Sequence, residues 1–174
     1  MRLLKFSGLA FAATGAAAAP AAANAAELSV SVDIPKLSVA EYHRPYVSLW
    51  IEKPDQTAVK TLAVWYDVKK RDNEGAEWLK DMRTWWRRAG RTLSLPADGV
   101  SGPTKAPGRA TAVFSGAQLA GLAPGEYALS VEAAREVGGR EVVRVPFTWP
   151  AKGAKTTSAT GSTELGAVSV TVKP

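Results

Sequence analysis

Residues 46–66 read YVSLWIEKPDQTAVKTLAVWY and hold two short segments rich in β-branched and aromatic residues. Such segments favour β-strands, here over residues 46–52 and 59–66. Residues 53–56 between them carry a proline and an aspartate able to bond to nearby backbone, which is typical of a turn. The stretch therefore predicts a β-hairpin.

Working outward, residues 28–34 alternate apolar and polar side chains, which predicts a half-buried strand. Further strands are expected over residues 110–114, 128–133, 140–149 and 166–172, with Gly138-Gly139 as a hairpin signal. Residues 93–107 carry three prolines and two glycines, and residues 151–162 lack periodicity, so both stretches are expected to be loops. The fold class is all-β, an immunoglobulin-like β-sandwich with one short amphipathic helix inserted.

That helix is expected over residues 76–89, with Gly90 as its stop. At about 100° per residue the apolar side chains fall within an arc of about 120°. They are Trp78, Leu79, Met82, Trp85, Trp86 and Ala89. The basic side chains lie opposite, so the helix can cover apolar surface with one face.

Residues 122–127, LAPGEY, look like the tyrosine corner of immunoglobulin-like domains, in which the phenol bonds to upstream backbone. They also resemble the start of a strand in the immunoglobulin-like module of flagellar hook-capping proteins. A structural role is therefore expected for Tyr127.

The N-terminus has the features of an export signal. Arg2 and Lys5 precede an apolar stretch, and Ala23-Asn24-Ala25 fits the cleavage rule. This pattern predicts a signal peptide over residues 1–26 and a periplasmic domain over residues 27–174. The mature domain is expected to have no transmembrane segment. The 174 residues contain no cysteine, which excludes thiol catalysis and zinc-thiolate sites. Nucleic acid is not an expected partner, because the chain is exported and its formal charge of +6 falls to +4 without Arg2 and Lys5.

The candidate site lies between residues 42 and 91, which hold five of the six tryptophans and the only histidine. An arginine beside an indole suits an anionic aromatic ligand, a phosphate-bearing cofactor or an acidic partner. We predict a ligand- or partner-binding set without a metal. It consists of Tyr42, His43, Arg44, Tyr66, Arg83, Trp85, Trp86 and Arg87.

Other readings of these residues stay open. Trp78, Met82 and Trp85 could simply cap the open end of the sandwich core, and His43 could serve only as a hydrogen-bonding residue where a strand begins. As the sole imidazole, His43 suits zinc poorly, although haem could use it with a Tyr or Met ligand. No nucleophile-elbow motif is present, and nothing in the spacing of Glu52, Asp67 and Asp81 brings these carboxylates together, so an enzyme is not expected.

Three blocks carry a family resemblance: residues 42–52, residues 61–67 with 78–86, and residues 132–136 with 139–141. They resemble the bacterial periplasmic family known as domain of unknown function 2271. Its members are often encoded beside PepSY membrane proteins and flavin transferases, which implies a role in envelope electron transfer or ferric-iron reduction. The expectation is a non-catalytic periplasmic binding or accessory protein with a PepSY-type envelope partner; the alternative is a carrier of a small anionic or haem-like ligand.

Those neighbours raise the question of covalent flavin. The flavin acceptor motif looks like Asp-x-x-Thr/Ser-Gly-Ala-Thr/Ser, and residues 154–160 lack its Asp and its Gly. Thr160 is therefore expected to be a loop threonine, and no cofactor is predicted.

Overall fold

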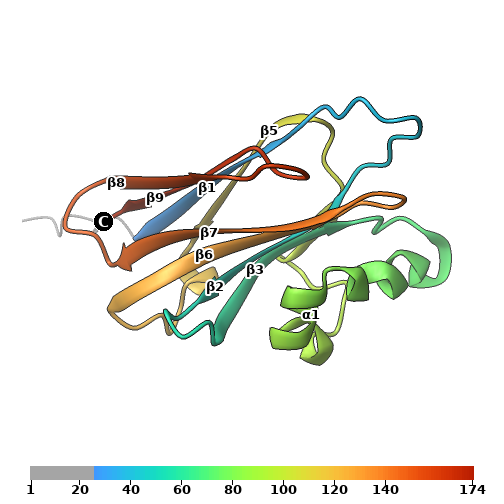
Figure 1. Cartoon of the computed structure of the whole chain (residues 1–174). Helices are drawn as coiled ribbons and strands as arrows, with labels where there is room; N and C mark the ends of the chain where they lie inside the picture. Colours follow the sequence, from blue (N-terminus) through green and yellow to red (C-terminus); the bar gives the residue numbers. More distant parts are fainter. Residues whose placement is uncertain (1–25) are drawn as a thin grey trace, which may run out of the picture.

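The computed structural model describes residues 26–174, and within them two β-sheets form a sandwich (Figure 1). One sheet has the strand order β5-β1-β9-β8 and the other the order β4-β3-β2-β6-β7. We call them sheet A and sheet B. The signal peptide predicted over residues 1–26 falls almost entirely outside the described residues. Within the described residues, none of the helices combines the length and apolar character that a membrane crossing needs.

Sheet A is built from β1 (Glu27–Ile34), β5 (Gly108–Ser115), β8 (Lys155–Thr160) and β9 (Ala167–Lys173). The strict alternation of β1 appears as alternating burial along the strand, which confirms the strand predicted there. β1 lies between β5 and β9 and pairs antiparallel with both.

Sheet B contains β2 (Tyr46–Glu52), β3 (Ala58–Tyr66), β4 (Ser101–Pro103), β6 (Gly125–Ala134) and β7 (Arg140–Trp149). β2 and β3 form the predicted hairpin, and β2 also pairs with β6. β4 pairs parallel with β3 inside the stretch predicted as a loop, so that prediction was wrong for three residues.

The main core fills the space between the sheets. Its side chains come from the inward positions of both layers, among them Val30, Leu49, Leu129 and Val170, each at most 1% exposed. The Tyr127 hydroxyl donates to the carbonyl of Ala123 at 2.8 Å, the upstream backbone bond of a tyrosine corner.

The predicted helix is not continuous. A 3₁₀ segment, η1 (Arg71–Asp81), is followed by a short α-helix, α1 (Arg83–Arg88), and a 3₁₀ turn, η2 (Gly90–Thr92). A further 3₁₀ turn, η3 (Gly116–Gln118), follows β5. At the break, Met82 has a ψ of 71°, outside helical geometry.

The cause of the break is Glu132, which lies on β6. Its carboxylate accepts the backbone N–H groups of Thr84 at 3.1 Å and Trp85 at 2.7 Å. In a continuous α-helix those N–H groups would bond to the carbonyls of Lys80 and Asp81. A side chain from the sheet thus starts a new helix at residue 83 by capping it.

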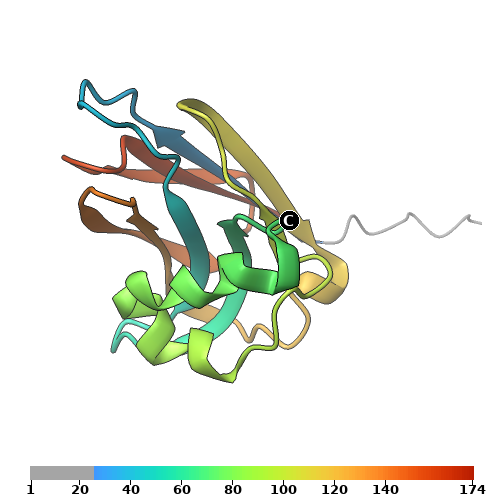
Figure 2. The same cartoon turned by 90° about the vertical axis from the view of Figure 1, so that its right-hand side faces the viewer.

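The helical segments cover the outer face of sheet B rather than the open end of the main core (Figure 2). Trp50, Val64 and Tyr66 of the sheet pack against Leu79, Met82 and Trp85 in a second cluster of buried residues. The Trp85 indole also donates to the hydroxyl of Thr61 at 3.0 Å. Much of the aromatic content of the chain therefore stabilises this second core.

β8 overturns the loop predicted over residues 151–162, and Thr160 ends a strand. The segment has no apolar periodicity because hydroxyl groups make its contacts. The hydroxyls of Thr156 and Thr171 bond across the strand pair at 2.8 Å, and that of Thr157 donates to the carbonyl of Pro146 at 2.7 Å.

Candidate functional site

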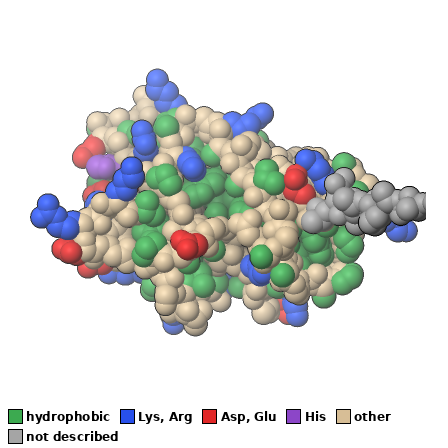
Figure 3. All heavy atoms as spheres, turned by 180° about the vertical axis from the view of Figure 1, so that it is seen from behind, with side chains coloured by type: hydrophobic (Ala, Val, Ile, Leu, Met, Phe, Trp, Pro, Cys, Tyr) green, Lys and Arg blue, Asp and Glu red, His purple; other side chains and the backbone are tan. Residues whose placement is uncertain are grey.

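A cleft of about 1020 Å³ opens at the end of sheet B where the β6–β7 turn lies. Three stretches and Thr104 line it; the stretches are residues 42–46 before β2, side chains from residues 67–83, and residues 134–140 around the turn. We call it the end cleft. In the space-filling view, Lys and Arg side chains gather near the histidine, which lies at the surface beside acidic groups (Figure 3).

The structure brings four of the eight predicted site residues into the end cleft: Tyr42, His43, Arg44 and Arg83. It places the other four elsewhere. Tyr66 and Trp85 are fully buried in the second core, and Trp86 packs partly buried against the same cluster. Arg87 is exposed, and its Nε donates to the carbonyl of Arg83 at 3.1 Å.

The cleft also contains an indole and a guanidinium that the sequence analysis did not assign to a site. Trp78 was placed on the apolar face of the helix, but it is 48% exposed and lines the cleft. Arg135 begins the β6–β7 turn, and its side chain is only 6% exposed. The family block over residues 132–136 includes Arg135 and was the one available signal for it.

Glu164 holds Arg135 in place. The Nε of Arg135 donates to one Glu164 oxygen at 2.9 Å and its Nη2 to the other at 3.1 Å, a bidentate ion pair. The β6–β7 turn packs closely against this pair. A Cβ atom on Gly138 would lie 2.7 Å from Arg135 Nη1, and one on Gly139 would lie 2.8 Å from a Glu164 oxygen. The two glycines thus allow the turn to approach the pair closely, while the positive φ of the turn, 52°, falls at Val137.

The segment that carries Glu164 is itself anchored by Glu141. The Glu141 carboxylate accepts backbone N–H groups from four consecutive residues, 162–165, at 2.6 to 3.0 Å. Burial alone would raise the pKa of Glu141, but bonds from the N–H groups of Ser162, Leu165 and Thr163 outweigh it and lower that pKa to about 2.

Two tyrosines of the cleft have raised pKa values, so both phenols are protonated at neutral pH. For Tyr42, burial is the main cause, and the nearby Glu164 carboxylate adds to it while the Arg135 charge opposes it. For Tyr46, burial and then the Asp67 carboxylate raise the pKa to about 12. Both phenols therefore keep the proton that a hydrogen-bond donor needs, and of the two hydroxyls that of Tyr42 is the one buried without a partner among residues 26–174.

His43 sits between two carboxylates at the edge of the cleft. Its Nε2 lies 3.0 Å from an oxygen of Glu41 and its Nδ1 lies 3.5 Å from one of Glu136. A haem held by His43 would need a Tyr or Met as its second ligand. Tyr42 lines the same cleft as His43, whereas Met82 and Tyr66 are fully buried in the second core. Among residues 26–174 there is also no cluster of three or more metal-ligating side chains.

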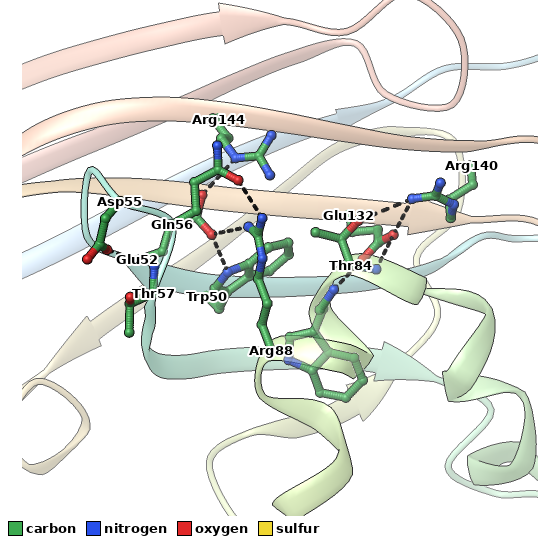
Figure 4. A network of polar contacts seen from close by, with 11 residues as sticks. Trp50, Glu52, Asp55, Gln56, Thr57, Thr84, Arg88, Glu132, Arg140 and Arg144 are labelled. Atoms are coloured by element: carbon green, nitrogen blue, oxygen red, sulfur yellow. Dashed lines mark hydrogen bonds and ion pairs between the residues drawn. The ribbon is translucent and has the colours of Figure 1, made fainter.

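The buried carboxylates on the outer face of sheet B hold the helical segments (Figure 4). Glu52 accepts the Trp50 indole at 2.9 Å, Arg88 at 2.7 Å and Arg144 at 2.7 Å. Arg140 lines the cleft but donates to Glu132 at 2.8 Å.

Of the carboxylates considered for catalysis, Asp67 and Asp81 line the end cleft, whereas Glu52 does not.

Comparison with known proteins adds the family. The family model described as predicted periplasmic protein, domain of unknown function 2271, matches residues 27–167. The chain belongs to this family. No curated protein and no solved structure gave a match. The matched range covers both sheets up to the start of β9, so the end cleft and the Arg135–Glu164 pair lie within the family region.

Proposed function

We propose that this protein is a non-catalytic binding protein of the periplasm and that the end cleft holds its ligand. The observation that carries the proposal is the cleft itself, together with two buried donor atoms of residues that line it, the Tyr42 hydroxyl and the Nη1 of Arg135, which have no partner within residues 26–174. Buried polar groups are ordinarily paired, so unpaired ones on residues that line a cleft favour a bound molecule as the missing partner.

The non-catalytic part rests on how the chain uses its buried acids. Glu52 and Glu132 are the two least exposed carboxylates, and arginines together with backbone or indole donors occupy both. A general acid or base must be able to exchange a proton with substrate. These groups instead stabilise the attachment of the helical segments to sheet B.

Docking onto a membrane protein is a second candidate function. Two exposed apolar side chains, Trp78 at 48% and Val137 at 77%, lie on the lining of the end cleft and suit a protein contact. The family resemblance implies a PepSY-type flavin or ferric-iron reduction system as the partner. The two functions are compatible if a ligand is delivered at that contact.

We also propose that the sandwich is immunoglobulin-like. β6 carries the tyrosine-corner bond and lies between β2 and β7, as strand F lies between C and G in that fold. β1 beside β5 then corresponds to the B–E pair. β9 takes the place of the first strand of that fold, next to β1.

Native mass spectrometry of the protein purified from the periplasm of its own host tests the binding function. A ligand mass is expected with the natural sequence and a much smaller amount with Trp78→Ala. Trp86→Ala is the matched control, because that indole does not line the cleft.

The second function is tested by a photo-crosslinking residue at Val137. Capture of one membrane protein from Val137, but not from the distant exposed Val113, supports docking. Ligand-free protein together with no crosslink would refute both functions.

A further inference from the structure

Two residues that line the end cleft, Arg135 and Tyr42, each hold a buried donor atom without an acceptor among residues 26–174. Arg135 bonds to Glu164 through Nε and Nη2, which leaves Nη1 buried without an acceptor in residues 26–174. The Tyr42 hydroxyl, close enough to Arg135 and Glu164 for their charges to act on it, is likewise buried without a partner.

An unsatisfied buried donor is a destabilising feature that a fold retains only with compensation. The Arg135 guanidinium cannot turn away to relieve it, because Glu164 grips it in two places and Gly138 packs on it. The pair is therefore preorganised for an acceptor that approaches from the cleft.

The charge balance of the cleft favours a singly charged acceptor. Glu164 offsets Arg135, and Glu132 offsets Arg140. Six of the remaining ionised groups make no ion pair among the described residues, and their charges balance. They are the cations Arg44, Lys70 and Arg83 and the carboxylates Asp67, Glu74 and Asp81. Glu136 also lines the cleft, with its carboxylate 3.5 Å from the His43 ring, so the lining carries no excess of positive charge. A doubly charged phosphate would therefore gain nothing from its second charge, whereas a carboxylate matches the two donors.

Trp78 provides the apolar part of the same cleft. Its indole is 48% exposed, and the Lys80 ammonium lies 5.8 Å from the ring centroid. An exposed indole of this kind offers a flat surface on which a second ring can stack.

We propose that the end cleft binds the carboxylate of a small aromatic acid, with the carboxylate on Arg135 Nη1 and the Tyr42 hydroxyl and the ring against Trp78. This inference rests on the proposed function and specifies its ligand. It makes Tyr42 and Arg135 the residues that select an acid over its neutral analogue.

Isothermal titration calorimetry with indole-3-acetate, indole-3-acetamide and phenyl phosphate tests it on the purified domain. The acid is expected to bind at least tenfold more tightly than the amide or the phosphate. Tyr42→Phe is expected to weaken the acid about tenfold or more, since it removes one bond to a charged group, and Trp78→Ala about tenfold.

Tyr66→Phe is the matched control. It removes a hydroxyl that is also buried without a partner but does not line the end cleft, so affinity should be unchanged. Neither Tyr→Phe change breaks a hydrogen bond within the described residues, so both variants should fold, and circular dichroism checks this.

Equal affinity for acid and amide, or no loss in Tyr42→Phe, overturns the carboxylate assignment. The binding function survives that result if protein from the host still carries a Trp78-dependent ligand mass. If the acid does not bind in calorimetry and protein from the host carries no ligand mass, both proposals are overturned together.

Discussion

Glu132→Gln should destabilise the protein by about 3 kcal/mol, because one carboxylate holds both the start of α1 and Arg140. The substitution leaves a single acceptor oxygen for three donors, the N–H groups of Thr84 and Trp85 and the Nη1 of Arg140. Removing one partner of a buried pair costs about 3 to 5 kcal/mol. Arg140 is 39% exposed and can turn to water, which sets the expectation at the lower end of that range.

Urea unfolding followed by tryptophan fluorescence measures this loss, and thermal unfolding should show a decrease in Tm of about 10 °C. Glu27→Gln is the matched control. Glu27 also bonds to a cation, Lys173, at 2.7 Å, but the two side chains are 30% and 52% exposed. A surface pair of this kind contributes about 0 to 1 kcal/mol.

Equal and small losses in the two variants would refute the reasoning, since Glu132 would then be no more than a surface acid. The near-ultraviolet circular dichroism of the folded Glu132→Gln variant reports on the cap. An unchanged spectrum together with a loss of stability would show that the cap remains and that Arg140 alone carries the effect. A double variant with Arg140→Ala separates these two contributions.

Three further results are expected. Trp85→Ala should cost about 3 to 5 kcal/mol in urea unfolding because its indole is fully buried, whereas Trp78→Ala should change stability by less than about 0.5 kcal/mol; similar losses would contradict the two environments. Tyr127→Phe should cost about 1 kcal/mol through loss of the bond to Ala123, and a neutral result would remove the tyrosine corner as a stabilising feature. The pKa of Glu141 is lowered from 4.5 to about 2, so its contribution to the free energy of unfolding is fully present above about pH 4.5 and is lost as pH falls toward 2. After discounting for partial exposure we expect this contribution to be about 1 to 2 kcal/mol. Glu141→Gln should therefore make the free energy of unfolding depend less on pH between those values than it does in the natural sequence.

Strands with a strong local pattern could be predicted from sequence. β1 alternates strictly and β2 with β3 concentrates β-branched and aromatic residues around a proline turn, so each was found close to its observed bounds. β8 could not be found this way, because its threonines bond to neighbouring strands and bury little apolar surface.

The break in the helix depends on a residue far away in the chain. Glu132 lies 48 positions from Thr84 and 47 from Trp85, and no local signal announces such a cap. Because the helical wheel assumed an unbroken rotation through Met82, it placed Trp78 and Trp85 on one face. In the structure Trp85 is buried and Trp78 is exposed.

Only half of the predicted site residues share the end cleft, because the site too depends on residues that are distant in the chain. Tyr42, His43, Arg44 and Arg83 stood out by residue type and do share a cleft. Arg135 did not, because its significance comes from Glu164, which the fold brings to it from 29 residues away. An unpaired guanidinium nitrogen has no signature in sequence.

The position of β1 has a consequence for the order in which the chain can fold. β1 is the first strand among residues 26–174, yet its partners are β5 and β9, and the register with β9 joins Glu27 to Lys173. Sheet A therefore cannot close until almost the whole chain is available, whereas β2 and β3 can pair as soon as they emerge. Long-range pairing of this kind slows folding. A chain with this topology would therefore stay unfolded, and able to pass through a membrane channel, until β9 is available for pairing.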